Sequence, residues 1–394
     1  MPKENKNPFA TKGQELLLRA SLMDGADAAG AWNEWKGTFD VETELDAGSR
    51  RLLPLLYKNL KRLGVKDELM GRLKGIYHKA WYRNQKLFFL AGKVLDRLND
   101  EGIRTIVHKG IPLSILYYRN YAVRPMDDFD VLVPASQALL TIDVLKLDGW
   151  NPADDVPPHL LMKYRHSLQF GNGSGRAMDL HWKLMFEATR VESLSDFWNK
   201  SVPVTVHGVP SSTLDPTDML FHTIVHGVKW NPLPAIRWIA DSVTIMRSSG
   251  TQIDWRRIIS YAKKYALCLQ LREGLGYLRE NFQAAVPAEV MDEINGLPVS
   301  GLERFEYRIL SNDYENQGGL LGHGPLYLTE YLRLAMGAPF LRALAGFPVY
   351  VRFRTGKESL PGLFSHLAAR SIGIAMGKIK IKIPRPAIFG RQGP

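Results

Sequence analysis

The chain has 394 residues, of which 45% are hydrophobic and 23% are charged. This balance is typical of a globular protein and excludes a disordered chain, a fibre or a coiled coil, while the length predicts two or three folding units. The single cysteine, Cys268, excludes an internal disulfide framework and favours a reducing compartment. The N-terminal segment is too polar for a secretory signal, and no apolar run approaches the ~18 residues that a spanning helix needs, so we expect a cytoplasmic protein.

Positive charge is concentrated at the C-terminal end of the chain. Residues 331–394 hold eleven Lys and Arg against one acid, Glu358, and so carry +10 of the net +11. Basic and aromatic residues interleaved in this way can contact an anionic membrane surface, RNA or an acidic protein, and the charge does not choose among them. A solvated helical extension is the alternative, with the Ile and Lys alternation over 378–383 predicting a strand.

Hydrophobic periodicity predicts a mixed architecture for the rest of the chain. Leucines at helical spacing predict an N-terminal helical region over residues 1–98. Strands are expected at 103–107, 129–133, 167–170 and 177–184, with helices after Pro112 and over 139–147. The last two strands form a predicted hairpin, so the core at 99–214 is expected to be α+β with a mixed sheet.

Two further segments are predicted beyond that core. Asp215-Pro216-Thr217-Asp218 has the residues of a helix start and predicts a helical domain over 215–300. The glycine-rich stretch 311–325 predicts a flexible connection within a basic C-terminal extension, 301–394.

Three carboxylates carry the chemistry that the sequence suggests. Asp128 and Asp130 are two apart on a predicted strand, so both project from one face and can converge on a pair of cations. Hard divalent ions such as Mg²⁺ bind few carboxylates and share their other positions with substrate phosphates, which suits phosphoryl or nucleotidyl transfer. Asp179 lies in an apolar run, where a charge is costly unless it is paired or metal-bound. Ordinary exposure on a strand face is the alternative for all three.

These residues also carry a resemblance to a known family. The stretch from His108-Lys109-Gly110 to Arg124-Pro-Met-Asp-Asp128-Phe-Asp130, followed by Asp179-Leu-His181-Trp, resembles the uncharacterised bacterial nucleotidyltransferase family of the polymerase-β-like superfamily. The resemblance covers about residues 100–290. It implies that Asp128 and Asp130 hold two Mg²⁺ ions, that Asp179 completes one metal site and helps to deprotonate the acceptor, and that an NMP group leaves an NTP with release of pyrophosphate.

The glycine turn departs from the wider superfamily. Most members have Gly-Ser or Gly-Gly there, whereas this chain has Lys109-Gly110. Gly110 can still let backbone N–H groups approach a triphosphate, and Lys109 and Arg124 can supply positive charge to it. The alternatives are a solvated Lys109 and a salt bridge from Arg124 to a neighbouring aspartate. His181 could contact a phosphate or be a hydrogen-bonded strand histidine.

Other polar and aromatic residues allow weaker predictions. His222 and His226 are four apart but lack the glutamate of a zinc-protease motif, so packing or substrate contact is expected. Trp230, Trp238 and Asp241 could border a base or acceptor pocket. The missing turn hydroxyl also supports a second function, a catalytically degenerate nucleotide-binding module whose basic tail recruits RNA, membrane or a biosynthetic partner. If the tail binds an anionic membrane surface, the protein would be peripheral at that membrane.

Overall fold

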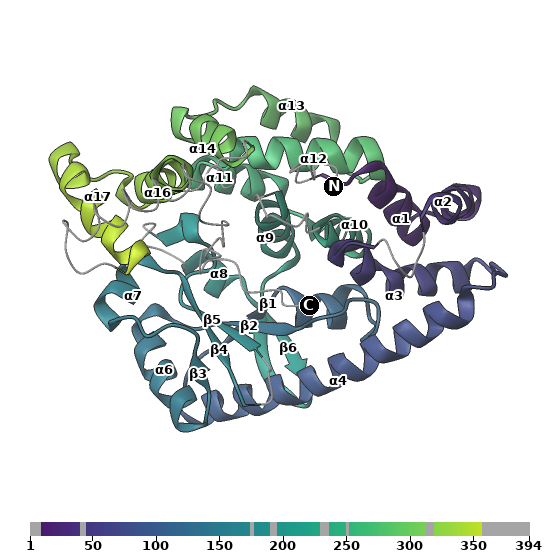
Figure 1. Ribbon diagram of the computed structural model, residues 1–394, viewed down its shortest axis with the longest axis horizontal. Coiled ribbons are helices and arrows are strands. Elements are labelled where there is room, and N and C mark those ends of the chain that lie inside the picture. The colour runs from purple at the N-terminus through teal and green to yellow at the C-terminus, as the bar shows by residue number, and fades with distance from the viewer. Residues whose placement is uncertain are drawn as a thin grey trace.

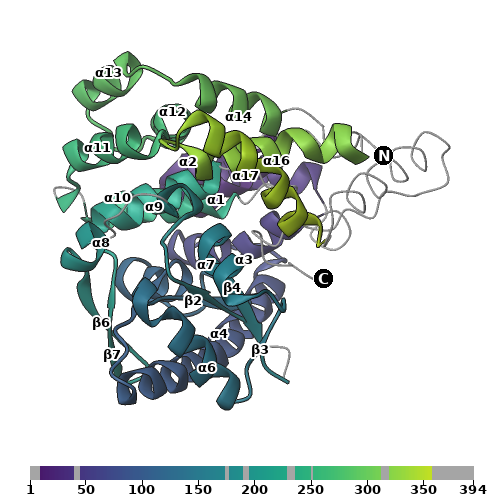
Figure 2. The same ribbon diagram turned by 90° about the vertical axis from the view of Figure 1, so that its left-hand side faces the viewer.

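A computed structural model of the protein describes residues 9–39, 45–173, 177–189, 195–228, 236–249, 252–311 and 319–356. A seven-stranded mixed sheet lies between two layers of helices (Figures 1 and 2). The α+β fold class that the sequence predicts is therefore confirmed.

The sheet mixes parallel and antiparallel neighbours. Its strands in spatial order are β3 (Asn151–Pro152), β4 (Ser167–Gly171), β5 (Ala177–His181), β2 (Asp128–Leu132), β1 (Ile106–His108), β7 (Val209–Thr213) and β6 (Val202–Val206). The pairs β2–β5 and β1–β7 are parallel, and the other neighbours are antiparallel. The predicted hairpin is β4–β5, although β5 ends at His181 instead of continuing to 184.

The hairpin β6–β7 is an addition to the predicted strands. His207 and Gly208 connect its strands with φ angles of 49° and 84°, the two positive values that a tight two-residue hairpin turn requires. Because β7 pairs with β1, this hairpin extends the sheet beyond the strands that carry the acidic motif.

Alternation along the strands gives the sheet two different faces. One face is apolar and packs against α4 (Met70–Asp100) and α6 (Ala138–Leu147), with Val107, Phe129 and Val131 in the shared core. The other face carries His108, Asp128, Asp130, Asp179 and His181, and α9 (Pro216–Val228) and α10 (Arg237–Ser249) lie over it (Figure 1). The polar residues therefore lie between the sheet and a helical layer.

That helical layer contains helices from both before and after the strands in the sequence. Its members, which share one apolar core with α9 and α10, are α1 (Lys12–Leu22), α2 (Gly25–Thr38), α3 (Ala47–Arg62), α11 (Trp255–Tyr265), α12 (Cys268–Phe282) and α13 (Ala288–Gly296). Asp215 caps α9 as predicted, since its Oδ1 accepts a hydrogen bond from the backbone N–H of Asp218 at 2.9 Å. Cys268 is buried and forms no disulfide.

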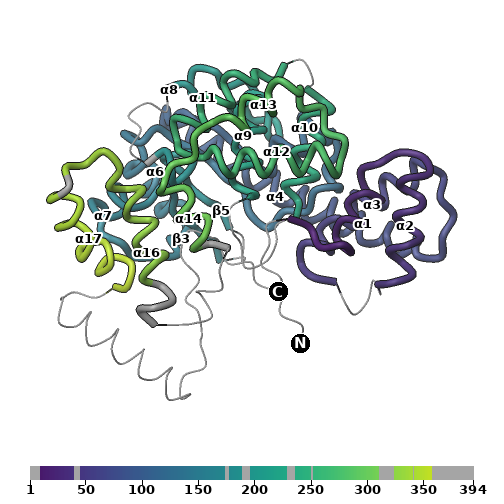
Figure 3. The backbone as a smooth tube through the Cα atoms, turned by 90° about the horizontal axis from the view of Figure 1, so that it is seen from above, coloured from purple at the N-terminus to yellow at the C-terminus, as the bar shows by residue number. Residues whose placement is uncertain are grey.

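The described part of the C-terminal extension is helical. It consists of α14 (Gly301–Ser311), α16 (Gly319–Ala335) and α17 (Phe340–Thr355). The prediction of a loop over 311–325 is wrong for 319–325, because this glycine-rich stretch forms the start of α16. Seen from above, α16 and α17 lie at the opposite end of the molecule from α1–α3 (Figure 3). The Ile and Lys alternation at 378–383 lies outside the described residues.

Aromatic contacts and a hydrogen bond attach this extension to the core. Tyr164 of α7 (Pro158–Tyr164) lies 5.4 Å from Tyr350 and 5.0 Å from Phe353, measured between ring centroids. Arg333 is buried and donates to the Tyr265 carbonyl at 2.8 Å. Among the residues described, no helix is both long and apolar enough to cross a membrane.

Candidate active site

The three predicted carboxylates lie on one face of the sheet. Asp128 and Asp130 are on β2, separated by Phe129, which points into the opposite core. The register of the parallel pair β2–β5 places Asp179 directly beside Asp130. Neighbouring strands are about 4.8 Å apart, so these two carboxylates are within reach of a shared cation. Gln169 is paired with Asp179 on the other side and completes this row.

Their charges interact because water has little access to them. Burial, with the neighbouring carboxylates of Asp130 and Asp128, raises the pKa of Asp179 to about 8. Burial and Asp130 also raise the pKa of Asp128. Burial acts in the same direction on Asp130, but the charge and hydrogen bond of Lys109, together with His108 and His226, outweigh burial and keep the pKa of Asp130 below its ordinary value. At neutral pH the carboxyl group of Asp179 therefore keeps its proton unless a further cation lies beside it.

Lys109 places its ammonium among these carboxylates. Its Nζ lies 2.5 Å from Oδ1 of Asp130, and its side chain is 22% exposed. Burial lowers the pKa of Lys109, but the carboxylates of Asp130, Asp179 and Asp128 together raise it by more. The pKa of Lys109 is therefore above its ordinary value. The residue adopts φ 58°, a conformation that is uncommon for a residue other than glycine and is often found at functional sites. Lys109 is thus an internal cation of the acidic cluster.

Gly110 brings the turn close to Arg124. A Cβ added to Gly110 would lie 2.4 Å from Sδ of Met126 and 2.8 Å from Nη1 of Arg124. Only glycine therefore lets the start of α5 (Gly110–Pro112) and the π-helical turn η1 (Leu113–Tyr117) approach the loop before β2 so closely.

Arg124 is held by Asp241 of α10, not by Asp127 or Asp128. Its Nε donates to both carboxylate oxygens, at 3.0 and 3.1 Å, and its Nη2 donates to Oδ2 at 2.9 Å. Tyr118 donates its hydroxyl to the same carboxylate at 2.9 Å. The remaining nitrogen, Nη1, is the one that faces Gly110. Asp241 therefore orients Arg124 toward the turn.

Arg237 is a basic residue of the site that the sequence analysis missed. It donates from Nη1 to the Pro125 carbonyl at 2.6 Å, just ahead of Asp128. Burial, together with the positive charges of Arg124 and Arg51, lowers the pKa of Arg237 to about 9. No short motif distinguishes this arginine in the sequence, since it is more than 100 residues from the acidic strand.

Histidines line the inner side of the acidic row. Nε2 of His181 lies 3.1 Å from Oδ1 of Asp130, which makes His181 a hydrogen-bonded strand histidine in this structure. His108 on β1 is directly paired with Asp130 and is completely buried. Its ring lies 5.3 Å from that of His222 on α9. Of the two aromatic residues proposed for a pocket, Trp238 lies in the apolar core, and Trp230 is outside the described residues.

The chain matches a known protein family. Residues 47–283 match the family described as "Uncharacterised nucleotidyltransferase". This match spans more than half of the chain and includes the acidic strands, the glycine turn and the helices above them. The chain therefore belongs to this nucleotidyltransferase family and is a transferase.

Solved structures with similar folds are distant. One is the solution structure of the antibiotic-resistance factor ANT(2'')-Ia, at 11% identity over 47% of this chain and 95% of that chain, with a TM-score of 0.35. Another is an antigenic nucleotidyltransferase-like protein from Paracoccidioides brasiliensis, at 11% identity over 54% of this chain and 98% of that chain, with a TM-score of 0.34. No curated protein matches the sequence.

The ion pair between Lys109 and Asp130 predicts opposite effects of Lys109→Met with and without Mg²⁺. Without metal, the variant is expected to lose about 1–3 kcal/mol of unfolding free energy, because Asp130 keeps its charge but loses its partner. Adding Mg²⁺ is expected to raise the unfolding free energy of the variant by more than that of the wild type, because no ammonium then competes with the metal for Asp130. Urea denaturation in EDTA and in Mg²⁺ measures both effects.

Lys36→Met is the matched control for this prediction. Lys36 also lies 2.5 Å from a carboxylate, that of Asp67, but this pair is outside the site. Its loss should lower stability equally with and without Mg²⁺. The same Mg²⁺ response in both variants would contradict a role of Lys109 as a competing cation.

Proposed function

We propose that the protein is a Mg²⁺-dependent nucleotidyltransferase that moves an NMP group from an NTP to a hydroxyl acceptor and releases pyrophosphate. The observation that carries this proposal is the direct pairing of Asp130 with Asp179, with Asp128 on the same face. Membership of the nucleotidyltransferase family supports the reaction class.

The residues present fit a hard divalent cation. All three carboxylates offer oxygen ligands, which Mg²⁺ prefers. Oδ1 of Asp179 is buried and has no hydrogen-bond partner among the described residues. Asp128, Asp130 and Asp179 would hold two Mg²⁺ ions, and such ions stabilise charge on the attacking and leaving oxygens of an in-line displacement. Because the Lys109 ammonium lies on Asp130, it would compete with a metal ion for the charge of this carboxylate.

The basic residues of the site then bind the nucleotide. Once released, Lys109 can pair with a phosphate oxygen. Arg124, fixed by Asp241, directs Nη1 at the glycine turn, and Arg237 adds a second guanidinium near Asp128. These groups hold the triphosphate in line with the acceptor, a positioning effect that makes up much of catalysis in phosphoryl transfer. Asp179, once ionised, helps to take the proton of the acceptor hydroxyl.

A transfer assay tests this function. Purified protein is incubated with Mg²⁺, a cell extract and each of the four NTPs labelled at the α-phosphate, and the labelled product is isolated. We expect one product class to carry the label, with pyrophosphate released in equal amount and the reaction stopped by EDTA. The absence of label transfer with all four nucleotides would contradict the proposal.

A nucleotide-binding module without catalysis is the second candidate. It is favoured by one observation, the Lys109 ammonium on Asp130, which in the metal-free protein neutralises a metal ligand. Calorimetry with Mg²⁺ and each NTP separates the two functions, since a module binds nucleotide but releases no pyrophosphate.

The raised pKa of Asp179 predicts a pH dependence of Mg²⁺ affinity. A metal binds the ionised carboxylate, so affinity should rise about tenfold per pH unit up to about pH 8 and then level off. In the metal-free protein the sign is reversed: stability should fall as the pH rises from about 4 to about 8, because only the unfolded chain then ionises freely. Calorimetric titration with Mg²⁺ over this range measures the first effect.

Asp179→Asn is the control for the pH dependence. The variant should bind Mg²⁺ weakly and lose most of the slope between pH 6.5 and 8. An unchanged slope would assign the titration to another group.

We propose a cytoplasmic location, supported by the buried, unpaired Cys268.

We also propose that residues 331–394 contact an anionic surface. On α17, Leu341 and Leu344 are 77% and 63% exposed, with Arg342 between them. An exposed apolar pair beside a cation suits the surface of an anionic membrane. Sedimentation with phosphatidylserine vesicles should be reduced in Leu341→Glu. Equal sedimentation of both proteins would leave RNA or an acidic protein as the partner, which a single-stranded RNA binding assay distinguishes.

A further inference from the structure

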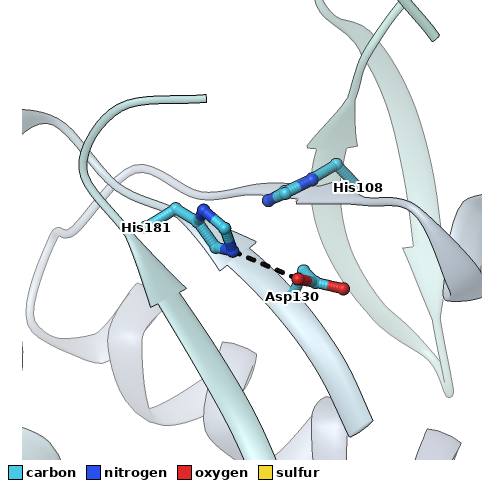
Figure 4. A group of neighbouring side chains, drawn as sticks. All are labelled: His108, Asp130 and His181. Atoms are coloured by element: carbon cyan, nitrogen blue, oxygen red, sulfur yellow. Dashed lines mark hydrogen bonds and ion pairs between the residues drawn. The ribbon is translucent and has the colours of Figure 1, made fainter. Parts of the chain in front are cut away.

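A second group of potential metal ligands lies inside the acidic row. Ligand atoms of His108, Asp130 and His181 all lie within 4.8 Å of one another, and all three residues are buried (Figure 4). They come from the three adjacent strands β1, β2 and β5. Figure 4 shows the His108 ring extending from β1 toward His181 and Asp130.

His108 is the unusual member of this group. It is 0% exposed, and neither Nδ1 nor Nε2 has a hydrogen-bond partner among the described residues. A buried polar group without a partner costs about 1–3 kcal/mol, so such groups are uncommon and usually have a reason. A metal ion is one partner that a lone imidazole nitrogen can bind directly.

The distances suit a cation that binds nitrogen. Two ligands of one tetrahedral zinc ion, each about 2.0–2.2 Å from the metal, lie roughly 3.3 Å apart. Nε2 of His181 and Oδ1 of Asp130 are already 3.1 Å apart, so these two atoms need almost no movement. Only His108 has to move closer, by about 1.5 Å at most if the ligand atoms are to reach that spacing from 4.8 Å.

We propose that His108, His181 and Asp130 form a binding site for one divalent transition-metal ion of the zinc class. Imidazole ligands select such ions over Mg²⁺, which prefers oxygen. The site is separate from the proposed Mg²⁺ position, shares only Asp130 with it, and does not depend on nucleotidyl transfer. His222 packs its ring edge-on against His108, and His166 lies 5.7 Å from His181 between ring centroids, so further imidazoles surround the ligands.

The inference predicts a use for this ion. Both Lys109 and His181 contact the Asp130 carboxylate. A cation on its inner side neutralises part of its charge and weakens its hold on Lys109. The ammonium is then freed for the nucleotide.

Metal binding to the full-length protein tests the inference. The protein is stripped with a chelator and titrated with Zn²⁺ and, separately, Co²⁺, in a millimolar excess of Mg²⁺. We expect one equivalent of Zn²⁺ and a Co²⁺ absorption spectrum of low coordination number. His108→Ala and His181→Ala should each weaken binding at least about 100-fold, because even a lost outer-sphere partner costs 10–100-fold.

Two controls make each outcome decisive. His159→Ala removes an exposed histidine of α7 and should leave binding unchanged. Asp128→Asn should retain the zinc equivalent while losing nucleotidyl transfer, so failure of one proposal does not affect the other. Zinc X-ray absorption of the wild type adds a readout that does not depend on folded variants, and it should show two imidazole ligands. No stoichiometric binding, no imidazole signal, or equal affinity in His108→Ala would each overturn the inference.

Discussion

Asp128→Asn is expected to lower nucleotidyl transfer roughly 10³-fold, because the metal sites supply several kcal/mol of transition-state stabilisation and each 1.36 kcal/mol is a factor of ten. Stability in EDTA should not fall. Burial and Asp130 raise the pKa of Asp128, which means that its ionised form is a cost to the folded state at neutral pH. Pyrophosphate release and urea denaturation measure the two effects.

Two neighbouring aspartates serve as comparisons. Asp127 is 64% exposed and pairs with Arg51, so Asp127→Asn should change the rate by about twofold at most. Asp130→Asn should lose both activity and stability, since Lys109 and His181 both contact Asp130. Near-wild-type pyrophosphate release by Asp128→Asn would remove the enzymatic assignment, whatever the stability.

The acidic face was predictable because it depends on local geometry. Alternation along a strand is enough to place Asp128 and Asp130 on one side, whatever the rest of the chain does. Their meeting with Asp179 depends on the register of β2 and β5, about 50 residues apart in sequence, and only the resemblance to a family gave that pairing in advance. The hairpin β6–β7 had a readable pattern of alternating valines around His207-Gly208 that the sequence analysis did not use.

The partners of the cations could not be predicted in the same way. Arg124 pairs with Asp241, 117 residues away, in preference to the aspartates next to it. Arg124 lies in the loop before β2, and the carboxylate that contacts its guanidinium comes from α10. The burial of His108 could have been predicted, because this polar residue stands at the end of a β-branched run. The start of α16 was predicted as a loop because its glycines disfavour a helix, but intrinsic propensity is only a weak guide to whether a helix forms.

The buried pair of Arg124 and Asp241 predicts the largest change in stability. Their side chains are 11% and 4% exposed. Arg124→Ala should cost about 3–5 kcal/mol of unfolding free energy, because it removes the ion pair of a buried carboxylate and leaves, among the described residues, the Tyr118 hydroxyl as its hydrogen-bond donor. Arg51→Ala removes the same kind of side chain from a pair with exposed Asp127 and should cost about 1 kcal/mol or less. Urea denaturation of both variants measures the difference.

A double variant separates the structural role of Arg124 from its role toward the nucleotide. Arg124→Met with Asp241→Leu replaces the ion pair by apolar side chains of similar size, and such replacements often restore stability. We expect the double variant to regain most of the stability that Arg124→Ala loses. Its KM for NTP should nevertheless remain raised, because no guanidinium then faces Gly110. If both stability and KM returned to wild-type values, Arg124 would be a structural residue only, and phosphate binding would fall to Lys109 and Arg237.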